Sequence, residues 1–242
     1  MIIGPIIGGA LAVYGLTTPL YVAAILPLIA VVIIYFSLEP SKKREKTKEK
    51  AIHFLDKRLR LPMIASFFTM YSIVTSQVCL GFYILDKFHL TQVQTAKSTG
   101  YILAIIGVVF ILTQIVVSKL KNISSHTWLV LGSILCAIGY FLISIITTQI
   151  ELTIAFSIGT VGLGMLMPAF LAITANSVQE HEQGVAAGTV SAAQGLGIII
   201  GPLLSTMLYQ IKPEIPFIFS ATTFLVLTII SLSYKKKEAI RC

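Results

Sequence analysis

Apolar residues fill eight long stretches of this chain, and the polar residues gather in the short segments between them. Several stretches reach the roughly 20 residues needed to cross a hydrocarbon core about 30 Å thick. Neither short strands nor alternating polarity suggests a barrel, and backbone groups in lipid need internal partners, so the spans are expected to be helices. The pattern predicts an all-α polytopic membrane protein with about eight spans at 1–17, 20–38, 62–85, 100–118, 127–147, 152–176, 185–209 and 216–234.

Composition supports the membrane-protein class and argues against disulfide and metal sites. Hydrophobic residues make up 56% of the chain, charged residues 12%, and the mean hydropathy is +0.90. Cys79, Cys136 and Cys242 offer neither a disulfide framework nor a CxxC pair. The four histidines are expected in loops far apart in the sequence: His53, His89, His126 and His181. We therefore predict no metal site and no cofactor.

The basic residues lie unevenly between the spans. Nine fall in 37–62, two in 118–126 and four in 235–242, so one side of the membrane holds 15 of 18. The other side holds only Lys87, Lys97 and Lys212. Lysine and arginine mark the cytoplasmic side of membrane proteins. We expect both termini and the long loop in the cytoplasm, with the protein in the plasma (inner) membrane. The net charge of +8 is thus read as a topology signal rather than nucleic-acid binding.

The first two spans and the last two repeat one pattern. "GPIIGGALAVYGLTTPLYVAAILPLIAVVII" aligns without gaps with "GPLLSTMLYQIKPEIPFIFSATTFLVLTIIS". Shared positions include Gly4 with Gly201, Pro5 with Pro202, Leu11 with Leu208, Pro19 with Pro216 and Ala24 with Ala221. Six spans separate the copies, so both copies have the same orientation, as in proteins built from two parallel six-helix halves.

Three stretches resemble the drug–proton antiporters of the major facilitator superfamily, the multidrug and tetracycline efflux-like branch. "GPIIGGAL" resembles the Gly-Pro motif of their fifth helix. "YILDKFHLTQVQTAKSTGYILAIIGVVF" is similar to their seventh and eighth helices, and "GLGMLMPAFLAITANSVQEHEQGVAAGTVSAAQGLGIIIGPLLSTMLY" to their tenth and eleventh. The resemblance implies a partial major facilitator fold that comprises helices five to twelve.

This resemblance divides the chain into parts. Residues 1–38 would be the last two helices of the N-terminal half. The first of them would lack roughly thirteen residues, and at 1.5 Å per residue it would be too short to cross a bilayer. Residues 39–61 would be a basic linker, 62–234 a six-helix bundle and 235–242 a basic tail. We expect a truncated gene, a wrong start codon or a genuinely reduced protein, and a missing N-terminal half as partner.

Small residues and prolines are the candidate packing residues of the two Gly-Pro helices. Glycines four or five residues apart let a neighbouring helix approach closely, and proline removes a backbone donor. The candidates are Gly4, Pro5, Gly8 and Gly9 in the first copy and Gly197, Gly201 and Pro202 in the second.

Polar side chains in the spans are the candidate wall of a substrate cavity. At 100° per residue, a stripe of 62–85 carries Thr69, Ser72, Ser76, Cys79 and Tyr83. Gln77 lies off this stripe, while Gln114 and Gln194 are isolated amides. Hydroxyls in such helices also bond their own backbone, so packing remains the alternative. The cavity candidates are Ser72, Ser76, Tyr83, Gln114 and Gln194.

Two function classes remain open. The first is efflux of small amphiphilic molecules across the lipid bilayer by proton antiport, although the coupling carboxylates of the resembled family belong to the N-terminal half. The second is a membrane interaction protein or half-transporter subunit without transport of its own. No enzyme is expected, because HExxH, GxSxG and a pair of intramembrane aspartates are lacking. Asp86, beside Lys87 at a span end, is the only stand-in for proton coupling.

Overall fold

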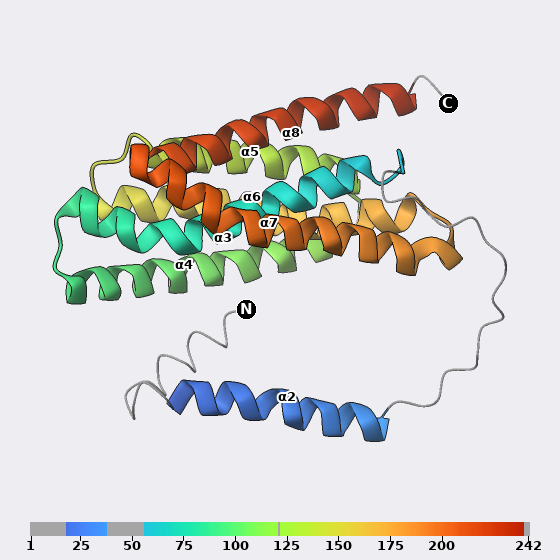
Figure 1. Cartoon of the computed structure of the whole chain (residues 1–242). Coiled ribbons are helices and arrows are strands. Elements are labelled where there is room, and N and C mark those ends of the chain that lie inside the picture. The colour runs from blue at the N-terminus through green and yellow to red at the C-terminus, as the bar shows by residue number, and fades with distance from the viewer. Residues whose placement is uncertain (1–17, 38–55, 121, 240–242) are drawn as a thin grey trace. The chain divides into compact units, whose positions relative to one another are not determined.

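The computed structural model describes residues 18–37, 56–120 and 122–239 (Figure 1). The regular structure of these residues is helical, as expected for an all-α membrane protein. The chain divides into two units, residues 1–51 and 52–242, and each is described by itself.

The first unit contains one apolar helix, α2 (Thr18–Ser37), with Pro27 inside it. It confirms a helix where the span at 20–38 was predicted, and its residues Tyr21–Ser37 count as a shorter apolar helix than those of the second unit. The span predicted at 1–17 lies outside the described residues, and so do its packing candidates Gly4, Pro5, Gly8 and Gly9.

The second unit is a bundle of six helices, each long and apolar enough to cross a membrane. The helices are α3 (Arg60–Phe88), α4 (Gln92–Lys119), α5 (Ser125–Ile143), α6 (Gln149–Asn176), α7 (Gln183–Ile211) and α8 (Ile215–Ala239), with the short 3-10 turn η1 (Glu180–Glu182) before α7. All six predicted spans of this region are confirmed, with shifted ends.

Two of the shifted ends are explained by capping. The helix predicted from residue 100 already begins at Gln92, because the Thr91 hydroxyl accepts from the Gln94 backbone N–H while the Gln94 side chain accepts from the Thr91 N–H. Thr148 and Glu151 form the same reciprocal pair at the start of α6. Such a capping box satisfies two backbone donors that a helix start would otherwise leave bare.

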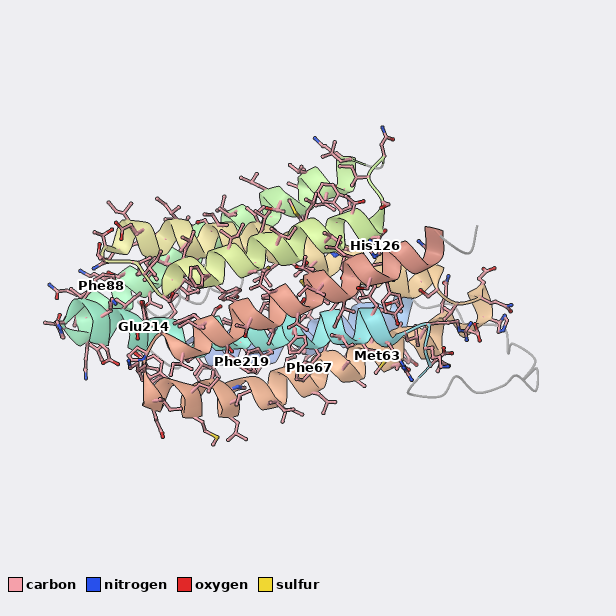
Figure 2. The ribbon with its side chains drawn as sticks, turned by 90° about the horizontal axis from the view of Figure 1, so that it is seen from above. Met63, Phe67, Phe88, His126, Glu214 and Phe219 are labelled. Atoms are coloured by element: carbon pink, nitrogen blue, oxygen red, sulfur yellow. The ribbon has the colours of Figure 1, made fainter. Side chains whose placement is uncertain are left out.

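Successive helices run in opposite directions, so the bundle has two polar ends. We name them the Arg58 end, where α3 starts, and the Lys87 end, where α3 finishes. Figure 2 shows Phe88 and Glu214 near one end, and Met63 and His126 toward the other. In cross-section, α3 contacts α7, α6 and α8, α5 lies against α6 and α8, and α4 packs mainly on α6.

Aromatic rings fill the centre of the bundle. Tyr140 of α5 stacks on Phe224 of α8 with ring centroids 5.8 Å apart and meets Phe156 of α6 edge-on. Phe217 of α8 contacts both Phe156 and Tyr83 of α3. Edge-to-face and offset contacts of this kind add to the dispersion energy of the buried rings. Four helices are thereby joined through one cluster.

The α5–α6 crossing brings two backbones into contact. A Cβ added to Gly139 of α5 would collide with the backbone nitrogen of Gly159. A Cβ on Gly162 of α6 would lie 2.6 Å from the backbone nitrogen of Cys136. Neither neighbouring atom is the end of a flexible side chain, so no local rearrangement relieves the clash. Glycine at these positions sets the distance between the two helices.

Gly139→Ala is expected to lower the free energy of unfolding by about 2 kcal/mol, since it overpacks a backbone contact. The matched control is Gly188→Ala in α7, where an added Cβ meets no heavy atom within 4 Å. The control should be neutral or slightly stabilising, because alanine has the higher helix propensity. Thermal unfolding of the purified protein in detergent compares the two variants. Equal unfolding midpoints would contradict the proposed crossing.

Candidate functional site

The hydroxyl stripe of α3 lies inside the bundle. Its residues are all buried: Thr69, Ser72, Ser76, Cys79 and Tyr83. The face that carries them therefore packs against other helices of the same unit, and it is not the face that the six helices leave open.

Hydrogen bonds within the bundle use several of these hydroxyls. Ser76 Oγ lies 2.8 Å from the Ser72 carbonyl oxygen and 2.9 Å from the hydroxyl of Tyr140, which itself donates to the Ser72 carbonyl. Tyr83 donates to the carbonyl oxygen of Ile143 at 2.8 Å. The Ser72 hydroxyl has no hydrogen-bond partner among the described residues. These bonds tie α3 to α5.

The amides are placed differently. Gln77 is exposed on α3, Gln114 is exposed on α4, and Gln194 is half-buried on α7. An amide turned toward hydrocarbon without a partner loses several kcal/mol relative to water, so polar side chains on spans normally face other protein or water. The three amides thus mark surface of the bundle that lipid is not suited to cover. Sequence reasoning set Gln77 aside because it falls off the hydroxyl stripe, and that same offset puts it on the open side of α3.

Gly197 and Gly201 bring α7 onto α3. A Cβ on Gly197 would lie 2.6 Å from the carbonyl oxygen of Phe67, and one on Gly201 would lie 3.2 Å from Val74. Pro202 follows inside α7, and its carbonyl oxygen accepts from the hydroxyls of Ser205 and Thr206. Gly197 and Gly201 of the second Gly-Pro copy therefore belong to one helix contact, whereas the contacts of Pro202 lie within α7.

Polar contacts join α3 to α7 at the Arg58 end. The guanidinium of Arg58 donates to both carboxylate oxygens of Glu182 at 2.9 and 3.1 Å. It also bonds Asp56, and this contact holds the pKa of the Asp56 carboxyl below its usual value. A planar guanidinium suits such paired contacts to carboxylates.

The Lys87 end carries a second set of contacts. Tyr209 of α7 donates to Asp86 Oδ2 at 2.7 Å, and Lys87 pairs with Glu214 at 3.2 Å. Asp86, the expected stand-in for proton coupling, is exposed at this helix end. Glu151 also lies at this end, in the first turn of α6. A carboxylate in such a place stays accessible to water and is poorly suited to alternate between two buried states.

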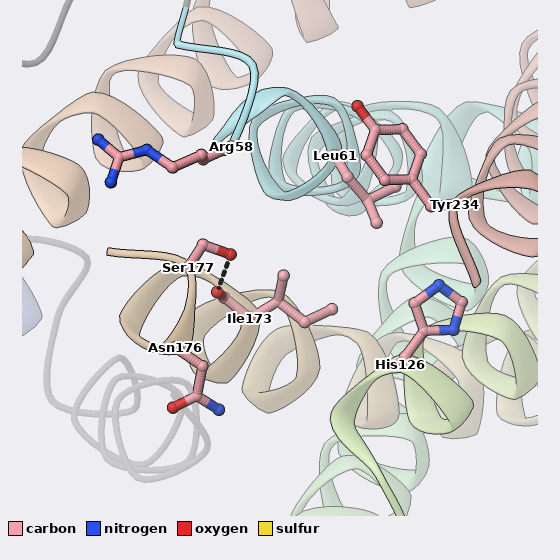
Figure 3. A pocket seen from close by; sticks show the side chains of 7 residues that line it. All are labelled: Arg58, Leu61, His126, Ile173, Asn176, Ser177 and Tyr234. Carbon is pink, nitrogen blue, oxygen red and sulfur yellow. Dashed lines mark hydrogen bonds between the residues drawn. The ribbon is translucent and has the colours of Figure 1, made fainter. Parts of the chain in front are cut away.

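One cavity of about 340 Å³ opens at the Arg58 end (Figure 3). Its lining consists of Arg58, Leu61, His126, Ile173, Asn176, Ser177 and Tyr234. Ser177 donates to the carbonyl oxygen of Ile173, while both ring nitrogens of His126 are buried without a partner among the described residues. The expectation of a loop at His126 is wrong, because the cap at Ser124 starts α5 ahead of it. The cavity lies among helix ends, away from the three amides.

Comparison with known proteins finds one matching family and several related transporters. The family model described as Major Facilitator Superfamily matches residues 1–189 and 124–240. Multidrug resistance protein 1 of Bacillus subtilis is 25% identical over 243 residues, which cover 97% of this chain and 61% of that protein. The proton-coupled antiporter flippase LtaA of Staphylococcus aureus strain N315 is 32% identical over 153 residues, 60% of this chain and 38% of that protein.

A solved structure agrees on the fold. The crystal structure of a POT family transporter, in complex with a thioalcohol-conjugated peptide, has a TM-score of 0.54 at 16% sequence identity. The match covers 93% of this chain and 54% of the POT family transporter chain. The chain spans about half the length of the curated relatives and structures it matches. The Gly-Pro repeat of the sequence, the six-helix bundle and these matches agree, and the chain belongs to the major facilitator superfamily of transmembrane transporters.

Proposed function

We propose that this chain supplies the C-terminal helices of an efflux transporter that exchanges small amphiphilic molecules for protons. The observation that carries the proposal is a set of three amides on a largely apolar bundle, Gln77 and Gln114 exposed and Gln194 half-buried. Amides bind many amphiphiles by hydrogen bonds without demanding one charge pattern. Relatives named for multidrug resistance, tetracycline resistance and proton-coupled antiport support the same substrate class and coupling ion.

Proton coupling requires a group that this bundle does not offer in its interior. Among residues 56–234, whose side chains the structure describes, the carboxylates lie at or near helix ends: Asp56, Asp86, Glu151, Glu180, Glu182 and Glu214. The coupling group is therefore assigned to the rest of the N-terminal half, and the partner proposed for this chain is that remainder, four helices and the start of a fifth. Without it, the chain would act as a half-transporter subunit, the second candidate function. No enzymatic role is proposed.

We assign the wall of the substrate cavity to the amides rather than to the hydroxyls. The hydroxyls of Ser76 and Tyr83 join α3 to α5, and Ser72 is buried beside them. All three side chains would therefore reach substrate only from behind this layer. Gln114 and Gln194 keep the role expected from the sequence, and Gln77 joins them.

Cysteine labelling tests this wall. In a background with the native cysteines replaced, Gln77→Cys and Gln114→Cys are expected to react with a water-soluble maleimide, because their side chains are exposed and a cavity is wet. Ser76→Cys is the matched control on α3, buried and hydrogen-bonded to Tyr140. Reaction at Ser76→Cys with none at Gln77→Cys would reverse the assignment.

Orientation is a second proposal, with the Arg58 end, the linker 39–61 and the tail 235–242 in the cytoplasm of the cell. Cysteines introduced at Thr148 or Glu214, both at the Lys87 end, should react with an impermeant thiol reagent in intact cells. A cysteine at Lys46 should react only after lysis. Labelling at Lys46 from outside would invert the topology.

Transport is tested in cells that carry either residues 1–242 alone or the same chain preceded by the first four helices and the start of the fifth from the Bacillus subtilis relative. We expect the chain alone to leave tetracycline accumulation unchanged, because hydroxyls and amides do not titrate near pH 7. The completed version should lower accumulation, and a protonophore should abolish the difference. Protonophore-sensitive extrusion by the chain alone would overturn the assignment, and Asp86→Asn would then locate the coupling group.

A further inference from the structure

The cavity at the Arg58 end lies among four helices, and we name it the axial cavity (Figure 3). The helix α3 contacts α6 and α8, and α5 contacts the same two helices, so the four surround a common axis. Each of them supplies lining residues: Leu61 comes from α3, His126 from α5, Ile173 from α6 and Tyr234 from α8. Because α4 and α7 contribute none of the lining, the axial cavity is separate from the amides on those two helices.

The axial cavity lies at the level of the membrane surface. Leu61 and His126 are the second residues of their helices, and Ser177 caps the end of α6. Tyr234 is the last residue of the apolar span Ile215–Tyr234 of α8. The hydrocarbon core of a bilayer is about 30 Å thick, and the polar headgroups lie directly outside it. Lipid headgroups and ions from the aqueous phase therefore both reach this depth.

His126 brings two unpartnered nitrogen atoms to the axial cavity. Both of its ring nitrogens are buried, and neither has a hydrogen-bond partner among the described residues. The hydroxyl of Ser177, by contrast, already donates to the carbonyl oxygen of Ile173 at 2.6 Å. A buried polar group that is left unpaired destabilises the folded protein. A ligand in this cavity of about 340 Å³ would supply the hydrogen bonds that the imidazole lacks.

The charges around the axial cavity favour an anion as its ligand. The lining contains Arg58 and no carboxylate. The carboxylates of Asp56 and Glu182 are each held by the guanidinium of Arg58 at 2.9 Å, and neither lines the cavity. Lys57 and Arg60, next to this residue in the sequence, are exposed. A ligand in the cavity therefore meets positive rather than negative groups.

The donors of the lining suit an oxyanion better than a metal ion. The described residues contain no group of three His, Cys, Asp or Glu side chains that could hold a metal. A protonated imidazole has two N–H donors, so the ring of His126 can serve one oxyanion with both nitrogens. The Nη1 atom of Arg58 has a second N–H group that no hydrogen bond of the described residues uses. Phosphate is the oxyanion that lipid headgroups and the aqueous phase have in common.

We propose that the axial cavity binds a phosphate group, held by the imidazole of His126 and attracted by the guanidinium of Arg58. Its source is the headgroup of an anionic phospholipid or phosphate in solution, since both present the oxygen atoms that these donors recognise. The site goes beyond the proposed function, because it is separate from the amides and its occupancy can be measured without transport.

Thermal unfolding of the purified chain in a non-ionic detergent tests the site. A saturating ligand should raise the unfolding midpoint by about 3 °C, because it binds the folded state alone. One series adds inorganic phosphate, with chloride at the same ionic strength as its control. The other adds phosphatidylglycerol, with phosphatidylcholine, which has no net charge, as its control. A shift with phosphatidylglycerol identifies the lipid as a source, and a shift with inorganic phosphate identifies the dissolved anion. No shift beyond the control in either series would overturn the proposal.

Substitution of His126 separates recognition from folding. His126→Phe removes both nitrogens and keeps a ring, so the protein without ligand should be at least as stable while its affinity for phosphate falls at least tenfold. His126→Gln keeps a donor and an acceptor and should retain part of the affinity. The matched control is His181→Phe on η1, at the same end but outside the lining, which should bind as before. Unchanged affinity in His126→Phe, or an equal loss in His181→Phe, would contradict the site.

Discussion

Every helix of this protein has to satisfy its backbone internally and then find partners without help from the hydrophobic effect, because lipid is as apolar as the side chains. Van der Waals packing and interhelical hydrogen bonds remain as sources of attraction, and the closest packing depends on glycine. Gly139 and Gly162 join α5 to α6, and Gly197 joins α7 to α3. Around these two contacts the aromatic cluster of Tyr140, Phe156 and Phe224 fills the centre. The bundle is therefore specified by where side chains are missing as much as by where they are large.

Hydroxyl groups in the spans also need partners inside the protein, because lipid offers no hydrogen bonds. Ser76 and Tyr140 bond each other and share the Ser72 carbonyl, so the two hydroxyls of this buried pair are both satisfied. The amides Gln77 and Gln114 have no such place in the unit and are left on its surface. In a water-soluble protein an exposed glutamine means little. In a span it indicates that another polar surface or water belongs beside it.

The spans were predictable from sequence, because an apolar run of membrane length admits one regular structure. The ends of the helices were less predictable. The capping box at Thr91 starts α4 well before the apolar run begins. Periodicity also predicted that Ser72, Ser76 and Tyr83 share a face of the helix. It does not show whether that face contacts other helices, lipid or a cavity. Only the packing of α6 and α8 against α3, with the hydrogen bonds from α3 to α5, shows that this face is interior. The Gly-Pro pattern predicted a helix contact at Gly197 and Gly201, while the contact partner, Phe67 to Val74 of α3, carries no sequence signal of its own.

The two capping boxes at the Lys87 end bear on how the chain enters the membrane. In the orientation proposed here, the turns before α4 and α6 must be carried through the bilayer while the hairpins insert. Each bare N–H group at a helix start would make that passage harder. Thr91 with Gln94, and Thr148 with Glu151, close two donors apiece by contacts only three residues long. These bonds form as soon as the turn exists, before any tertiary partner is present, so biogenesis of the hairpins does not have to wait for the rest of the bundle.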